Sequence, residues 1–358
     1  MSPPADWGCQ RALSNNVIGF ESTPTRFPAR AKSLGNLPHR TDWAKIPPLK
    51  IHSHTTQWRP SVATIPDNFL GLPRPHAEYR KAKYAVLPIP YDSTVSFQVG
   101  TRHGPRAILT ASQQVELFDQ EYEREFFKAG VATLDPVAPN MAGPKAMHED
   151  IFAEARRVVA DGKFLIGLGG EHSITSALVR AVLTKHKKLS VLQIDAHADL
   201  RAEYEDTPFS HAAVMRRVVE MGVKVTGVGI RNYCIEEHRF MKSKKIAPIS
   251  ARQAREDADW MMRAVESLGE NVYVTIDIDG FDPAYAPGTG TPEPGGLDWF
   301  QVTDLLKATA MNRRIVAADV VEVIPLPGNA MTEFLAAKLI YKLIAHIEAN
   351  GGGRRTKN

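Results

Sequence analysis

Residues Ser190–Asp199 read SVLQIDAHAD, and this stretch decides how the rest of the sequence is interpreted. A short apolar run, Ser190–Ile194, ends in Asp195, His197 and Asp199, which occupy alternate positions. Alternate side chains of an extended chain project to the same side, so two carboxylates and one imidazole converge. At a buried site such groups cost several kcal/mol unless a cation neutralises them. The stretch therefore predicts a buried strand that ends at a metal site.

Apolar runs of similar length recur on both sides of this stretch, separated by longer segments with the apolar spacing of helices. The runs are Tyr84–Pro88, Gly130–Leu134, Phe164–Leu168, Ser190–Ile194, Val223–Gly227, Ile246–Ile249, Asn271–Ile276 and Ile315–Val321. Strands that alternate with helices indicate βαβ units and a parallel sheet, and near-continuous apolarity is typical of strands covered on both faces. We therefore expect an α/β fold, a three-layer α/β/α sandwich around a central, mainly parallel sheet of about eight strands.

Two more of these runs end in ionisable residues. Asn271–Ile276 leads into Asp277 and Asp279, again at alternate positions. Phe164–Leu168 leads through Gly-Gly-Glu to His172, where the glycines permit a tight turn. Ligands of open α/β sheets bind beyond the carboxyl ends of the strands. The three strand ends together therefore predict one shared metal site.

The six candidate ligands are four carboxylates and two imidazoles, with no thiolate among them. This composition favours harder divalent ions over a structural zinc site, so Mn²⁺ fits well and Ni²⁺ or Fe²⁺ are alternatives. Six ligands that include potentially bridging carboxylates suit two ions roughly 3.5 Å apart. Glu171, which precedes His172, either orients a ligand or lies on the surface.

The three strand-end motifs resemble the signatures of the ureohydrolase superfamily, which contains arginases and agmatinases. They are Gly169–Ser173, Asp195–Asp199 and Asp277–Pro283, and the stretches Pro90–Thr94 and Ser210–Ala212 resemble the agmatinase branch. The resemblance covers roughly residues 80–348 and implies the arginase-like fold. It also implies a hydrolase that releases urea and an amine from a guanidino compound.

The resemblance assigns the candidate ligands to two metal ions. One ion is held by His172, Asp195, Asp199 and Asp277, and the other by Asp195, His197, Asp277 and Asp279. Asp195 and Asp277 would therefore bridge the ions. Catalytic roles are implied for Asp199, which would orient the attacking water and pass on its proton, and for His211, which matches the proton-shuttle histidine of the family.

Substrate contacts are less well specified by these motifs. Gln301 stands where arginases place a glutamate that grips the guanidinium, and Glu322 either supplies the missing negative charge or is a structural acid. The segment 201–209 lacks the features by which arginases bind an α-amino acid, which disfavours arginine. Agmatine is the first candidate substrate, because acids in this segment could attract its amine. Guanidinobutyrate, free guanidine and a substituted biguanide are alternatives.

Two alternatives to a ureohydrolase follow from the same ligands. A metal-binding regulatory subunit without catalysis is disfavoured, because every ligand position of the family motif is filled. A deacetylase-like amide hydrolase with a related sheet would bind one zinc ion per chain. The number of metal ions therefore distinguishes the deacetylase-like alternative from the ureohydrolase.

Residues 1–78 are rich in proline yet contain several tryptophans. Proline breaks regular structure, whereas disordered tails seldom contain so many large apolar residues. We expect an extended N-terminal arm that packs on the body or on a neighbouring subunit, then a catalytic domain at 79–350 and a flexible tail at 351–358. The resemblance also implies a homo-oligomer, a trimer or a hexamer.

Composition argues against nucleic-acid and membrane partners. The formal net charge of +4 is small for 358 residues and no long basic stripe occurs, while no apolar run reaches transmembrane length. Cys9 and Cys234 form no disulfide framework, which favours a reducing compartment. We expect a cytoplasmic location, with mitochondrial import as the alternative because the N-terminal region is rich in arginine and poor in acids.

Overall fold

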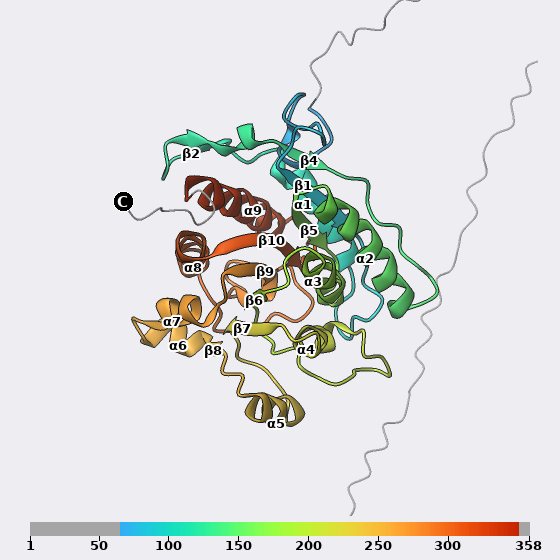
Figure 1. Cartoon of the computed structure of the whole chain (residues 1–358), viewed down its shortest axis with the longest axis vertical. Helices are drawn as coiled ribbons and strands as arrows, with labels where there is room; N and C mark the ends of the chain where they lie inside the picture. The colour runs from blue at the N-terminus through green and yellow to red at the C-terminus, as the bar shows by residue number, and fades with distance from the viewer. Residues whose placement is uncertain (1–64, 351–358) are drawn as a thin grey trace, which may run out of the picture. The chain divides into compact units, whose positions relative to one another are not determined.

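A computed structural model describes residues 65–350 of the protein (Figure 1). The predicted tail and residues 1–64 of the predicted arm lie outside this range. Phe69 and Leu72 are buried in the core, so the folded body includes residues that precede the expected start of the catalytic domain. Within residues 65–350, no helix is long and apolar enough to cross a membrane.

The central sheet has eight strands, and all of its strand pairs are parallel. In spatial order the strands are β4 (Val131–Thr133), β1 (Tyr84–Ile89), β5 (Phe164–Gly169), β10 (Arg314–Val321), β9 (Asn271–Asp277), β6 (Leu189–Ile194), β7 (Lys224–Gly229) and β8 (Ile249–Ser250). The expected parallel sheet is therefore confirmed. A small antiparallel pair, β2 (Phe118–Asp119) and β3 (Arg124–Glu125), lies outside this sheet and is not among the strands expected from the sequence.

Helices cover both faces of the sheet and complete the expected three-layer sandwich (Figure 1). The described helices are α1 (Gly104–Ser112), α2 (Pro144–Ala160), α3 (Thr175–Leu183), α4 (Val214–Glu220), α5 (Ile235–Lys244), α6 (Ala251–Glu256), α7 (Trp260–Ser267), α8 (Trp299–Asn312) and α9 (Met331–Ala349). One apolar core joins the sheet to α1, α7, α8 and α9, and the other joins it to α2, α3, α4 and α5. On β9, Val274 faces the first core and Tyr273 the second, as the two-residue period of a strand requires.

Strand register brings the predicted ligands together at one edge of the sheet. Ile194 of β6 pairs with Ile276 of β9, so Asp195 and Asp277 follow neighbouring positions. Val321 of β10 pairs with Asp277, which places the next residue of β10 beside the same point. The candidate site thus lies at the carboxyl ends of central strands, where ligands of open α/β sheets bind.

Candidate metal centre

The first group of predicted ligands surrounds His172, which follows β5. Its Nδ1 atom lies 3.2 Å from Asp195 Oδ2, 3.0 Å from Asp199 Oδ2 and 3.3 Å from Asp277 Oδ2. This buried nitrogen has no hydrogen-bond partner among the described residues. A ring nitrogen and three carboxylate oxygens therefore share a space whose donor atoms suit a divalent cation.

The second group surrounds His197, in the loop after β6. Its Nδ1 atom lies 2.9 Å from Asp279 Oδ2 and 3.8 Å from Asp195 Oδ1. Asp195 thus contributes one oxygen to each group. This arrangement allows its carboxylate to bridge two ions, as the family resemblance implies.

Backbone N–H groups hold the two carboxylates at the end of β9, Asp277 on the strand and Asp279 in the 3-10 helix that follows it, in place. Asp277 Oδ1 accepts from the Asp279 N–H at 3.0 Å, and its Oδ2 faces His172. Asp279 Oδ1 accepts from the Ala196 N–H at 3.0 Å, and its Oδ2 faces His197. One oxygen of each carboxylate is therefore fixed, and the other is free to bind an ion.

The ring of His172 is oriented from its other nitrogen. Thr275 Oγ1 donates to Asp319 Oδ1 at 2.6 Å, so this hydroxyl can accept from His172 Nε2–H at 2.9 Å. Asp319 is fully buried and also accepts from the hydroxyl groups of Thr175 and Tyr273. With an ion bound, these hydrogen bonds would leave the Nδ1 lone pair facing the ion, an arrangement typical of metal-binding histidines. Without an ion, burial alone would lower the pKa of His172, but the neighbouring carboxylates outweigh burial and raise this pKa well above its usual range.

The electrostatics of the protein without ions show that the site requires positive charge. Burial, together with the charges of Asp279 and Asp195, raises the pKa of Asp277 well above its usual range. Burial and the charge of Asp195 raise the pKa of Asp199 to about 7. Burial alone would lower the pKa of His197, but the hydrogen bond and charge of Asp279 outweigh it and raise the pKa to about 11. The residues therefore fit a pair of divalent cations.

A cavity of about 230 Å³ opens above the ligands and contains two other predicted site residues, His211 and Glu322. Glu322 follows β10 in a left-handed backbone conformation, with φ at 62°, and its Oε1 accepts from the His172 N–H at 2.6 Å. Burial lowers the pKa of His211 to about 4, so its ring is neutral at pH 7. The structure thus brings the metal ligands, a carboxylate and a neutral imidazole to one cavity.

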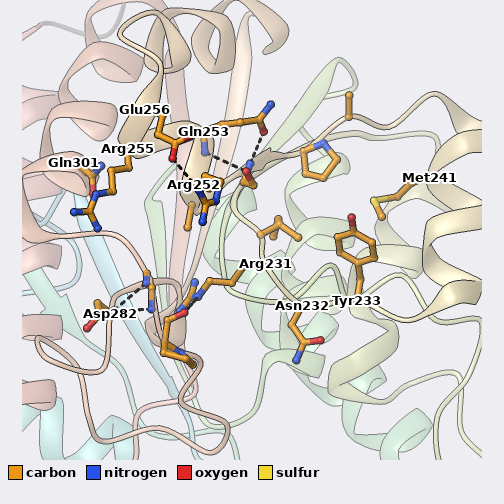
Figure 2. Close-up of a pocket in the computed structure, with 18 of the residues that line it drawn as sticks. Arg231, Asn232, Tyr233, Met241, Arg252, Gln253, Arg255, Glu256, Asp282 and Gln301 are labelled. Carbon is orange, nitrogen blue, oxygen red and sulfur yellow. Dashed lines mark hydrogen bonds and ion pairs between the residues drawn. The ribbon is translucent and has the colours of Figure 1, made fainter.

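Gln301 does not lie in this cavity. It belongs to the first turn of α8, where its side chain and that of Asp298 form a capping box, and its Nε2 donates to the Ala254 carbonyl at 3.0 Å. The spacing Asp298-x-x-Gln301 is itself the signature of such a cap. Gln301 instead lines a neighbouring, wider cavity of about 1650 Å³, which shares Asn232 and Tyr233 with the first. Figure 2 shows Gln301 among the residues that line this wider cavity.

Arg231 lines the same wide cavity and was not identified from the sequence (Figure 2). Its guanidinium donates to the carbonyls of Asp279 at 2.8 Å, Glu293 at 2.6 Å and Pro294 at 3.1 Å, and to that of Gly229 at the end of β7. It therefore ties the loop that carries a metal ligand to two neighbouring segments. Arg231 stands two residues after the end of β7, and this position near a strand end is the one feature of the sequence that points to it.

Residues 82–346 match the sequence profile of the arginase family. This chain belongs to the arginase family. The chain is 37% identical over 295 residues to the N(1)-aminopropylagmatine ureohydrolase of Synechocystis sp., covering 78% of this chain and 96% of that protein. The resemblance stated from the motifs is confirmed, and the protein is a ureohydrolase enzyme.

Solved structures of the arginase family agree with the fold. The agmatine ureohydrolase of Thermoplasma volcanium superposes with a TM-score of 0.71 at 32% identity, covering 80% of this chain and 96% of that one. The proclavaminate amidino hydrolase of Streptomyces clavuligerus superposes with a TM-score of 0.74 at 27% identity, covering 80% and 98%. The names of these relatives differ in substrate, so membership of the family leaves the substrate open.

Proposed function

We propose that this chain hydrolyses a linear guanidino compound to urea and an amine in the cavity above the predicted ligands, with agmatine as the first substrate. The observation that carries the proposal is the convergence of both ligand groups, Glu322 and His211 on one cavity. Relatives whose names contain agmatine or aminopropylagmatine support this choice of substrate.

Two divalent cations would be held by the side chains already described, Mn²⁺ being the first candidate and Ni²⁺ the alternative. His172, Asp195, Asp199 and Asp277 would hold one ion, and Asp195, His197, Asp277 and Asp279 the other. When bound, such ions supply Lewis-acid activation of water near neutral pH. The predominance of carboxylates supports Mn²⁺ over a softer ion.

Glu322 is the proposed contact for the substrate guanidinium. The His172 N–H fixes one of its oxygens, and its side chain lines the cavity beside Asp277. Burial raises the pKa of Glu322 well above its usual range, and an approaching guanidinium would restore the ionised form. The carboxylate thus favours a cationic, planar group at the reacting position.

Asp199 and His211 are the proposed proton carriers. Asp199 also lines the cavity, and its backbone holds a left-handed conformation with φ at 53°. It would accept the proton of the attacking water, while neutral His211 would take up a proton from solvent at Nε2 and pass it to the leaving amine. Asp199 would therefore act both as a ligand and as a base.

A second candidate substrate, guanidinobutyrate, is favoured by Arg201. Arg201 lines the cavity and lies over the Tyr204 ring, with 5.0 Å between its guanidinium carbon and the ring centroid. The acids of the segment 203–206, which were expected to attract an amine, are exposed and do not line the cavity. A substrate with a terminal carboxylate would find its counter-charge here.

We also propose that the chain forms a homo-oligomer, a trimer or a hexamer. Support comes from exposed large apolar side chains: Phe97, which lines the cavity, is 71% exposed, and Val99, two residues further along the chain, is 73% exposed. Burying these apolar side chains against a neighbouring subunit would favour association. Light scattering coupled to size-exclusion chromatography measures the oligomeric state in solution. A monomer would overturn this proposal.

A urea-release screen tests the proposed function. Protein loaded separately with Mn²⁺ and with Ni²⁺ would be assayed on agmatine, guanidinobutyrate, guanidine and a substituted biguanide. The expected result is urea from agmatine, with Asp195→Asn inactive as the matched control. A higher kcat/KM on guanidinobutyrate would favour the second candidate, and no urea from any compound with two metals bound would overturn the proposal.

A further inference from the structure

Thr94 occupies a position between two functional side chains that are distant in the sequence. It lies in the segment after β1, is buried, and contacts Glu171 on one side and His211 on the other. Thr94 belongs to the stretch Pro90–Thr94, which resembles the agmatinase branch, but that resemblance implies no role for Thr94 itself. Its hydroxyl therefore links the strand-end loop of β5 to the predicted proton shuttle.

Glu171 determines where the hydroxyl proton of Thr94 points. This carboxylate is fully buried, which decides between the two roles left open for it in favour of an internal one. Its Oε2 accepts from the Thr94 N–H at 2.6 Å, and its Oε1 accepts from Thr94 Oγ1 at 2.7 Å and from Ser173 Oγ at 2.5 Å. Three donors converge on it, so the Thr94 hydroxyl donates to Glu171.

The oxygen of the Thr94 hydroxyl then remains only as an acceptor. It accepts from the His211 backbone N–H at 3.2 Å and lies 3.4 Å from His211 Nδ1. An Nδ1–H can donate to this oxygen, whereas an unprotonated Nδ1 would face it lone pair to lone pair. Ser210 Oγ, also 3.4 Å from Nδ1, can accept from or donate to this nitrogen because hydroxyl groups rotate, so the contact with Ser210 selects neither tautomer.

We infer that Thr94 is a positioning residue for His211, which it holds with Nδ1 protonated and the Nε2 lone pair free for the cavity. The inference rests on the proposed function, in which His211 carries the proton to the leaving amine. The Tyr204 ring meets the His211 ring edge to face, with centroids 5.8 Å apart, and restricts its rotation. Glu171 acts through Thr94 and does not contact the imidazole in this arrangement.

A substitution series at Thr94 tests the inference. Thr94→Val removes the hydroxyl but keeps the backbone N–H bond to Glu171, and Thr94→Ser restores the hydroxyl. We expect the valine variant to lose about ten-fold in kcat, less than the ~10²–10⁴ typical of the proton-transfer group itself, with KM and bound metal unchanged. The serine variant should regain activity, and the exposed neighbour Ser93→Ala serves as the control.

The same substitution in a His211→Ala background separates positioning from a general structural effect. If Thr94 acts through the imidazole, Thr94→Val should cause no further loss of kcat once the imidazole is absent. An equal ten-fold loss in both backgrounds, or a valine variant as active as the parent, would overturn the inference.

A spectroscopic measurement keeps this test independent of the substrate. ¹⁵N NMR of histidine-labelled protein, with the His211 signals assigned from their loss in His211→Asn, reports which ring nitrogen carries the proton. We expect protonated Nδ1 in the parent chain and a mixture of tautomers in Thr94→Val. An unchanged tautomer in the valine variant would overturn the inference, whether or not any guanidino compound released urea. Absence of urea by itself would count against the proposed function and not against the role of Thr94.

Discussion

Replacing Glu322 by glutamine separates the charge of this side chain from its structural hydrogen bond. The glutamate Oε1 accepts from the His172 N–H at 2.6 Å, and the amide oxygen of glutamine can preserve that bond. The position of the first metal-binding histidine should therefore be retained. What is lost is the negative charge that is proposed to meet the substrate guanidinium.

The magnitude of the loss follows from the burial of this site. Unit charges about 4 Å apart attract each other by about 4 kcal/mol at an effective dielectric constant of about 20. A hydrogen bond to a charged group contributes about 1.5–3 kcal/mol, against about 0.5–1.5 for a neutral one. Because Glu322 is only 8% exposed, solvent screens it weakly. We expect Glu322→Gln to lose about 2–4 kcal/mol of transition-state binding, or about 30- to 10³-fold in kcat/KM.

Steady-state urea release from agmatine by Mn²⁺-loaded protein measures this effect, with thermal unfolding and metal content measured alongside. Glu322→Ala is the matched contrast, because it leaves the buried His172 N–H without an acceptor and should also cost about 1–3 kcal/mol of stability. Unchanged kcat/KM in the glutamine variant would refute a substrate contact. Loss of activity together with loss of metal would show instead that Glu322 acts through His172.

Four further predictions follow from the described contacts. Asp199→Asn should abolish urea release while far-UV circular dichroism stays unchanged; residual activity above about 1% would argue against its role as base. His211→Ala should lower kcat by about 10²–10⁴ and retain the bound metal; full turnover would exclude a proton shuttle. Arg231→Met should destabilise the chain by about 2–4 kcal/mol in thermal unfolding, without rescue by lysine, because lysine cannot reproduce the planar fork of donors. Burial lowers the pKa of His148 from 6.5 to about 4, so on acidification the unfolded chain is protonated at this residue before the folded one, and the contribution of His148 to stability should fall by up to about 3 kcal/mol between pH 6.5 and 4; an equally steep fall in His148→Gln would contradict this.

Much of the ligand arrangement could be predicted because it is local in the sequence. Asp195, His197 and Asp199 follow one apolar strand, and Asp277 and Asp279 stand at the end of another, so closeness in sequence placed each set at one strand end. The extended conformation expected for these residues was wrong, because Asp199 is left-handed, with φ at 53°, and Asp279 lies in the 3-10 helix Ile278–Gly280. The parallel sheet followed from alternating runs, and it made the strand ends adjacent. The roles of these ligands in metal binding and catalysis stay predictions until they are measured.

Other features depend on contacts that no local pattern shows. Thr94 meets side chains 77 and 117 positions further along the chain, and Arg231 meets carbonyls up to 63 positions away. Gln301 was related to the substrate by motif position, whereas its amide caps a helix and meets a neighbouring backbone carbonyl. Tertiary packing decides such contacts, and neither motif spacing nor apolar periodicity specifies it.

The number of divalent ions bound per chain tests the central claim most directly. Elemental analysis of Mn²⁺-loaded, dialysed protein should find two ions per chain, because two ligand groups share Asp195. Asp195→Asn should lower the affinity for both ions, since its carboxylate faces each group. One ion per chain in the parent protein, or an Asp195→Asn variant that keeps two, would contradict a binuclear site bridged by this residue.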